Sequence, residues 1–168
     1  MKACDYIKKT REYLDYLERH LINVDEAWHI VKEKCADMRF IYDDVFYHHL
    51  EHDILQHDLS KLSKSEFIPY RETFYPTKYE PKNIELGEAW AHHQNHNPHH
   101  WQHWTNILGH RFHPDDWEIN AAHMVIDWMA MGTEFGDTAK EYYEKNRDEI
   151  KLPKYAIDFI YEIFKRVY

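Results

Sequence analysis

The sequence predicts an all-α protein, and three observations lead to that expectation. Apolar residues recur at helical intervals along most of the chain, and no segment alternates apolar and polar residues as a half-buried strand would. The 168 residues include only four glycines, and none belongs to a glycine-rich loop. A chain of this length can bury enough surface to fold alone, so we expect a single helical domain over residues 1–168.

The helical periodicity is clearest near the N-terminus. Apolar positions follow one another in steps of three and four over residues 14–35, which predicts one face of a long amphipathic helix. A second helical stretch over residues 41–54 follows closely, so we expect the two helices to form an antiparallel hairpin. Ser63 and Glu66 then have the spacing of a capping box that starts a short helix.

Further helices are expected over four later segments. They are 84–96, 101–107, a helix that starts after Asp115 or Asp116 and ends before Gly132, and an amphipathic helix that starts at Pro153. We expect residues 14–130 to form the core of the domain and residues 138–168 to form a C-terminal helical extension.

Composition and charge exclude several classes of protein. A net charge of -9 disfavours binding to bulk nucleic acid, although single lysines and arginines can still hold one small phosphorylated molecule. There is no run of about 18 apolar residues for a membrane span, and the N-terminus lacks the apolar segment of a secretion signal. Cys4 and Cys35 form no C-x-x-C pair and fit reduced thiols, so we expect a cytoplasmic protein.

Histidine is strongly enriched, with 15 among 168 residues, and imidazole is a common protein ligand of transition metals. It is concentrated near the segment HDLSK at residues 57–61 and in the run over residues 92–100. Adjacent His and Asp can chelate, because the imidazole supplies a nitrogen and the carboxylate has two oxygens that can bridge two ions. We expect one or two divalent transition-metal ions, with Fe, Mn, Zn, Ni and Co as candidates.

Two His-Asp pairs occur, and we expect His57-Asp58 to be the ligand pair. The other, His52-Asp53, is followed by Ile-Leu-Gln instead of a turn that carries lysine, and we interpret it as part of a solvated helix face. The segment HDLSK resembles the core motif of the HD superfamily of metal-dependent phosphohydrolases. In that motif a His precedes the His-Asp pair, a Lys lies three residues beyond it, and a distant Asp completes the site.

The preceding His of this pattern is best supplied by His20. A hairpin that bends near residues 36–38 places His20 level with His57, whereas His29 lies too close to the bend and has charged neighbours at helical spacing. The alternative is that His20 flanks the apolar stripe and is only hydrogen-bonded.

The distant Asp is best supplied by Asp127, whose carboxylate lies on an otherwise apolar helical face and needs a partner to justify burial. We expect a metal to be that partner, with a buried salt bridge or a helix hydrogen bond as the alternative. His123 lies four residues earlier on the same face. Three roles stay open for it: a ligand, a residue that orients ligands, or a packed histidine.

The run over residues 92–103 suggests a second ion, because a break at its Asn-Pro dipeptide would let later histidines turn back toward earlier ones. The ligand candidates are His93, His99 and His100. The histidines expected to face solvent or to orient ligands from outside are His92, His96 and His103. The alternative is a solvated patch that binds metal weakly.

The whole arrangement resembles a small branch of the HD superfamily found in bacteria and their phages. The matching pieces are His20-x-x-x-Val24, HDLSK, Glu66-Phe67, Pro69-Tyr70, the pattern HHxxxNxHH over residues 92–100, and Asp127-Trp128. HDxSK joined to HHxxxNxHH is the specific part. His123 departs from the pattern, because Glu is expected there. The resemblance implies an all-α HD-type bundle with a metal centre.

It also implies a phosphohydrolase that cleaves a phosphomonoester or phosphodiester bond of a small substrate, such as a nucleotide, with water activated by the metal. Asp58 would bridge the ions and act in catalysis with Lys61, while Lys61, Arg71 and Asn97 would contact the substrate. The alternative for Lys61 is a surface cation that only lies near the motif. Two alternatives use the same ligands: an HD-fold di-iron oxygenase and a catalytically silent metal-binding protein.

Overall fold

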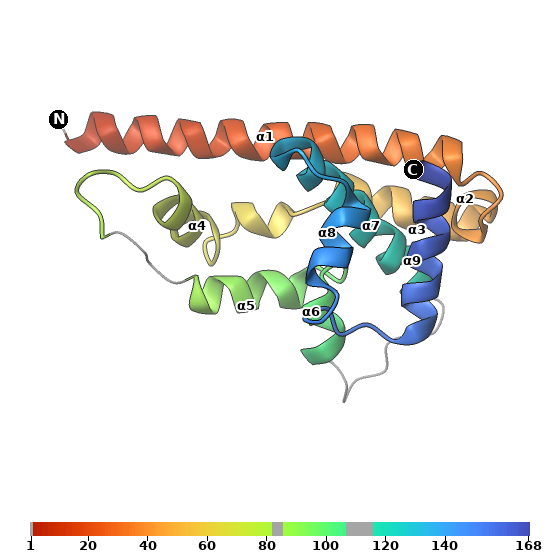
Figure 1. The fold of residues 1–168 in the computed structure, drawn as a ribbon. Helices are drawn as coiled ribbons and strands as arrows, with labels where there is room; N and C mark the ends of the chain where they lie inside the picture. Colours follow the sequence, from red (N-terminus) through yellow and green to blue (C-terminus); the bar gives the residue numbers. More distant parts are fainter. Residues whose placement is uncertain (1, 82–85, 107–115) are drawn as a thin grey trace. The chain divides into compact units, whose positions relative to one another are not determined.

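The computed structural model describes residues 2–81, 86–106 and 116–168, and these residues are helical with no strand among them (Figure 1). The all-α prediction is therefore confirmed. The helices are α1 (Lys2–Lys34), α2 (Arg39–Tyr42), α3 (Asp44–Leu55), the 3-10 helix η1 (Leu59–Leu62), α4 (Phe67–Phe74), α5 (Gly87–His96), α6 (Trp101–Asn106), α7 (Trp117–Phe135), α8 (Ala139–Asn146) and α9 (Lys154–Val167).

The described helices form two compact units, which we treat separately. Unit 1 comprises the chain up to Arg19 together with residues 58–97, and unit 2 comprises residues 20–57 and 98–168. Helix α1 supplies its first half to unit 1 and its second half to unit 2. A single domain over the whole chain stays a prediction.

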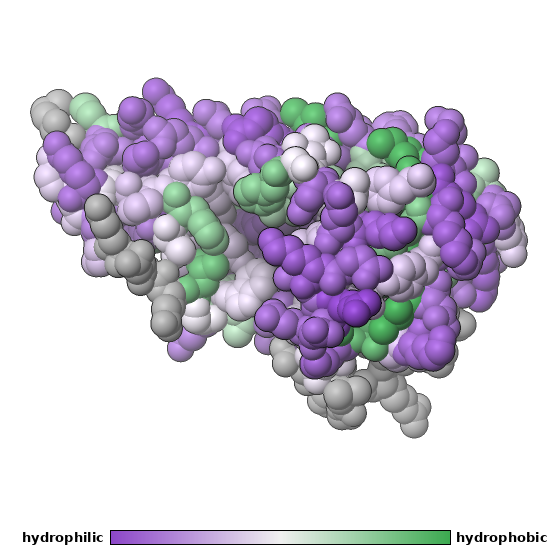
Figure 2. All heavy atoms as spheres, in the orientation of Figure 1, coloured by the Kyte–Doolittle hydropathy of each residue, from purple (hydrophilic) through white to green (hydrophobic). Residues whose placement is uncertain are grey.

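Unit 2 is built around α7. Every residue from 119 to 130 is buried, and α7 packs against α3, α8 and α9. A helix that is apolar on nearly all sides belongs in a core, whereas α8 and α9 are amphipathic and show hydrophilic side chains on their outer faces (Figure 2). Cys35 is part of this core as a free thiol, and burial raises the pKa of that thiol to about 11.

The end of α7 differs from our prediction. The helix does not stop before Gly132 but continues to Phe135, and Gly136 ends it in the left-handed conformation with a φ of 84°. A Cβ atom on Gly132 would collide with the backbone oxygen of Asp137. The glycine at 132 is thus explained by the close return of the chain and not by helix termination.

Unit 1 has a smaller core, rich in tyrosine. Its buried apolar members are Tyr13, Leu17, Tyr70 and Ala89, from α1, α4 and α5. The predicted capping box at its centre is wrong: α4 starts at Phe67, and its N-cap residue, Glu66, makes no side-chain cap. Instead Glu66 is fully buried and turns its carboxylate toward other residues of the unit.

The other helix predictions are largely confirmed. The stretch over residues 41–54 is divided, because the Asp43 side chain accepts hydrogen bonds from the amides of Val45 and Phe46 and starts α3 there. The break after His96 and the helix after Pro153 occur as predicted. Asp116 precedes α7, and the predicted positions 84, 85, 107 and 115 lie outside the described residues.

Candidate metal centre

Three buried donor atoms of unit 2 form a tight triangle. His20 lies on α1, His57 follows the end of α3, and Asp127 lies on α7. The Nε2 atoms of His20 and His57 are 3.0 Å apart, and Oδ1 of Asp127 lies 3.3 Å from the first and 3.5 Å from the second. Each of the three residues is less than 9% exposed. The structure therefore brings together the first histidine, the second histidine and the distant aspartate of the predicted pattern.

The size of this triangle fits a metal site. Zinc bonds of about 2.0–2.1 Å to nitrogen or oxygen in tetrahedral geometry place neighbouring donor atoms roughly 3.3 Å apart. Two imidazole nitrogens at 3.0 Å cannot both point a proton at each other, so at most one of them donates in this contact. A cation between these atoms would displace any proton on the two nitrogens and bind their lone pairs together with the carboxylate.

The carboxylate of Asp127 is held in its anionic form. Burial by itself would raise its pKa, but hydrogen bonds from His20 and His57 outweigh burial and keep the pKa of Asp127 well below its usual range. The buried partner that the sequence requires for Asp127 is thus present, and it consists of two imidazoles. A negative charge remains in the core of unit 2 at neutral pH.

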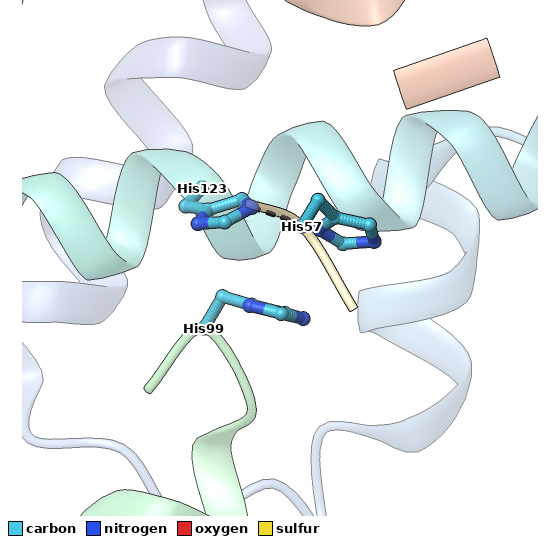
Figure 3. A group of neighbouring side chains, drawn as sticks. All are labelled: His57, His99 and His123. Carbon is cyan, nitrogen blue, oxygen red and sulfur yellow. Dashed lines mark hydrogen bonds between the residues drawn. The ribbon is translucent and has the colours of Figure 1, made fainter. Parts of the chain in front are cut away.

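Two more histidines extend the cluster. Nδ1 of His57 lies 2.8 Å from Nε2 of His123, and His99, from the turn before α6, stacks on His57 with ring centroids 4.6 Å apart (Figure 3). His57, His99 and His123 each offer one nitrogen, and these atoms all lie within 4.8 Å of one another. His123 is therefore buried beside the predicted ligands and is itself placed as a candidate ligand.

His100 belongs to the same unit and offers a second grouping. One ligand atom from each of His99, His100 and Asp127 lies within 4.8 Å of the others. Unit 2 thus holds three overlapping sets of donor atoms, in which His57, His99 and Asp127 each belong to two sets, and His100 is the one half-buried member. His93, the third histidine that we expect to bind a second ion, belongs to unit 1.

In unit 1, Asp58 lies among charged neighbours. Oδ2 of Asp58 is 2.5 Å from Nζ of Lys61, and its Oδ1 is 3.3 Å from Nε2 of His93. Asp58 has a φ of 54° and is the one non-glycine residue with positive φ among the described residues. Such strain is often found at functional positions, where surrounding contacts maintain it.

Glu66 organises the histidines of α5. Its Oε1 accepts a hydrogen bond from Nδ1 of His92 at 2.6 Å, and its Oε2 accepts one from Nδ1 of His93 at 2.9 Å. Ser60 of the HDLSK segment also donates to Oε2, at 3.0 Å. Burial would raise the pKa of Glu66, but the hydrogen bonds from the two histidines lower it below its usual value. Glu66 thereby fixes His93 so that its other nitrogen faces Asp58.

Sequence reasoning assigned Glu66 only to a helix cap and to a family motif, and missed this role. The signal was available in principle, because a buried histidine ligand commonly gives its second ring nitrogen to a carboxylate. Glu66 precedes an apolar segment, however, and nothing local distinguishes a carboxylate that caps a helix from one that reaches α5.

The predicted substrate contacts are mostly engaged elsewhere. Arg71 is fully buried and pairs with Glu80 at 2.5 and 2.6 Å, with its guanidinium over the ring of Tyr6. Asn97 donates to Oγ of Ser60 and to the backbone oxygen of His93, each at 2.8 Å. These contacts place both residues in the framework of unit 1, which leaves Lys61 as the predicted substrate contact that lies at Asp58.

Most of the residues that we expect to face solvent do so, and His103 is the exception. His52 and Asp53 have side chains that are 70% and 42% exposed, and the side chain of His29 is 65% exposed beside Asp25. His96 is exposed and stacks on the ring of His92, whereas His103 is buried in unit 2. Exposure therefore separates the pair His57-Asp58 from the pair His52-Asp53, and His20 from His29.

These features define a helical protein with buried groups of histidine and aspartate that could hold a metal ion. The chain belongs to a family of unknown function, DUF5662, whose model matches residues 9–166. No curated protein and no solved structure matches the chain. Among the described residues, no helix combines the length and the apolar character that crossing a membrane requires.

Proposed function

We propose that this protein is a metal-dependent phosphohydrolase that acts on a small phosphorylated molecule. The observation that carries the proposal is the triangle of His20, His57 and Asp127, with 3.0–3.5 Å between its donor atoms. The same three residues occupy the positions of the HD motif that the sequence resembles. Their burial supports a preorganised site, because each side chain is held by packing before an ion binds.

The donor set suits a first-row transition metal. It combines neutral imidazoles with a carboxylate and has no thiolate, a combination used for Zn, Fe, Mn, Co and Ni. When bound, such an ion supplies Lewis acidity, which lowers the pKa of water and polarises a phosphoryl oxygen. His99 and His123 add further nitrogens beside His57, so unit 2 has donors enough for four-coordination.

Asp127, Asp58 and Lys61 have separate tasks in this proposal. Asp127 holds both His20 and His57 through its hydrogen bonds and keeps an anion in the site. Asp58 follows His57 directly in the chain, and its role as a bridge between two ions stays a prediction. Lys61 binds Asp58 and carries the positive charge that a substrate phosphate requires.

The test starts from protein purified without a histidine tag, because a tag would add metal ligands. Metal content is measured, and metal-free protein is reloaded separately with Mn, Fe, Co, Ni and Zn. Each form is assayed with p-nitrophenyl phosphate, bis-p-nitrophenyl phosphate and a set of nucleotides. We expect hydrolysis in at least one metal form and none in metal-free protein. Oxygen consumption by the Fe form without phosphate release, or metal binding without any turnover, would contradict the proposal.

A pair of matched variants makes this test specific. Asp58→Asn removes one carboxylate charge with little change in shape, and we expect metal and activity to fall together. Asp53→Asn makes the same change in the exposed His-Asp pair and should leave both nearly intact. Circular dichroism on both variants shows whether helicity is kept, since an unfolded variant would also lose metal.

A further inference from the structure

Two tyrosine hydroxyls are buried in unit 1 without a hydrogen-bond partner among the described residues. They belong to Tyr13 on α1 and Tyr70 on α4, and these residues are 1% and 5% exposed. A buried donor that is left unsatisfied destabilises the fold, so most such groups have a partner in the native protein. Two of them in one small core indicate an acceptor that belongs to a ligand.

The neighbours of the Tyr70 ring indicate where this acceptor lies. Nζ of Lys61 lies 5.8 Å from the centre of the Tyr70 ring, and the ring of His93 packs at 5.7 Å from the same centre. Asp58 and Glu66 act on both phenols and help burial to raise the pKa of each, while Lys61 opposes them at Tyr13. Tyr70 thus lies beside the segment that carries Asp58 and Lys61, and Tyr13 packs in the same small core as Tyr70.

The nearby carboxylates are already engaged. Glu66 accepts hydrogen bonds from two histidines and from Ser60, and Asp58 pairs with Lys61 and His93. Three donor groups stand beside these carboxylates: the two phenol hydroxyls and the ammonium of Lys61, which also pairs with Asp58. Both phenols keep their protons at neutral pH and can donate them in hydrogen bonds, since the pKa of an ordinary phenol is about 10 and burial raises it further.

We propose that Tyr13, Tyr70 and Lys61 form the oxyanion pocket of unit 1 and bind the oxygens of a phosphoryl group. A tetrahedral phosphoryl group has several acceptor oxygens and no obligatory donor, which matches a set of donors on separate elements. The choice of phosphate rests on the proposed function, and the pocket takes over the substrate contacts that sequence reasoning gave to Arg71 and Asn97.

Tyrosine-to-phenylalanine variants test the pocket, because each removes one oxygen and keeps the ring. Binding of inorganic phosphate is measured by calorimetry on the full chain with its bound metal, and metal content is measured in parallel. We expect Tyr13→Phe and Tyr70→Phe each to weaken phosphate binding about tenfold, with metal content and helicity unchanged. Tyr143→Phe is the matched control, since Tyr143 is 4% exposed in the core of unit 2, and it should bind phosphate as the unchanged protein does.

Several outcomes would overturn the pocket: no phosphate binding by the unchanged protein, unchanged affinity in both variants, or a loss of metal that accompanies the loss of phosphate. Unchanged affinity would mean that the hydroxyls bind only water. The results distinguish a wrong pocket hypothesis from a wrong hydrolase hypothesis. Ester turnover with full phosphate affinity in both variants contradicts the pocket alone, whereas weakened phosphate binding without turnover in any metal form contradicts the hydrolase alone.

Discussion

Two regions of the molecule combine histidines with a carboxylate but differ in how hydrogen-bond donors match acceptors. One is the imidazole cluster of unit 2 around His57, and the other is the carboxylate network of unit 1 around Glu66. Around Glu66 each donor meets an acceptor, because His92, His93 and Ser60 all donate to one carboxylate. In the unit 2 triangle, two imidazole nitrogens face each other beside a single carboxylate. The first arrangement is a closed hydrogen-bond network around one anion, whereas the second gathers two imidazoles and a carboxylate, a donor set that a cation could use.

The largest effect should come from removing the negative charge of Asp127 in unit 2. Asp127→Asn removes the charge that stabilises both a bound cation and the orientation of His20 and His57. We expect bound metal to fall to about a tenth of the unchanged level or less. Elemental analysis after gel filtration measures this. Asp158→Asn on the exposed face of α9 is the control, and equal metal loss in both variants would remove Asp127 from the site.

A second contrast uses two histidines of one helix. His20→Ala should weaken metal binding roughly tenfold to a hundredfold, because it removes a corner of the triangle. His29→Ala should leave it unchanged, since His29 lies 65% exposed on the same helix beside Asp25. Competition with a chromogenic chelator gives the two affinities. Similar losses of metal affinity in both variants would show that the position of a histidine along α1 does not determine whether it binds metal.

Glu66→Gln examines the network of unit 1. The change leaves His92 and His93 without their buried anion, and we expect the free energy of unfolding to fall by about 3 kcal/mol. The metal bound by the imidazole cluster should stay near its normal amount. Urea unfolding and metal analysis on the same sample measure both. A loss of metal without a loss of stability would reverse the roles that we assign to the two regions.

The smallest effect concerns acid stability in unit 1. Hydrogen bonds from Arg71 lower the pKa of Glu80 from 4.5 to about 2. A lowered folded-state pKa stabilises the fold fully above pH 4.5, and this contribution is lost as the pH falls toward 2. Glu80→Gln should lower the free energy of unfolding at pH 7 by on the order of 2–3 kcal/mol, and the difference should shrink below pH 4.5. Urea unfolding at pH 7, 5 and 3 follows it, and a constant difference would contradict the assignment.

Residues with periodic or local determinants were predictable from the sequence. The apolar steps over residues 14–35 identify α1, and the Asn-Pro dipeptide after His96 ends α5. His20 follows from counting residues on either side of a bend, because helix rise makes position a function of sequence distance. The structure places its Nε2 atom 3.0 Å from that of His57.

Residues whose roles depend on distant partners were not predictable. Glu66 has the spacing of a capping box, yet its carboxylate binds histidines that lie 26 and 27 residues later. Gly132 has the look of a helix end, but its reason is the approach of Asp137. In both cases a local rule competes with a tertiary contact, and only the folded chain shows which one prevails.

Two independent requirements meet at position 58. One is the left-handed backbone conformation, and the other is the metal-binding side chain that we propose. With a φ of 54°, the position suits Gly, Asn and Asp, since other side chains meet the backbone there. A ligand role, in contrast, requires a carboxylate. Among all substitutions at position 58, Asn and Gly should give folded protein with little bound metal. Glu keeps the charge but should give a lower yield of folded protein. If Asp58 binds metal as we propose, aspartate is the one amino acid that meets both requirements, and substitutions at this position should rarely be neutral.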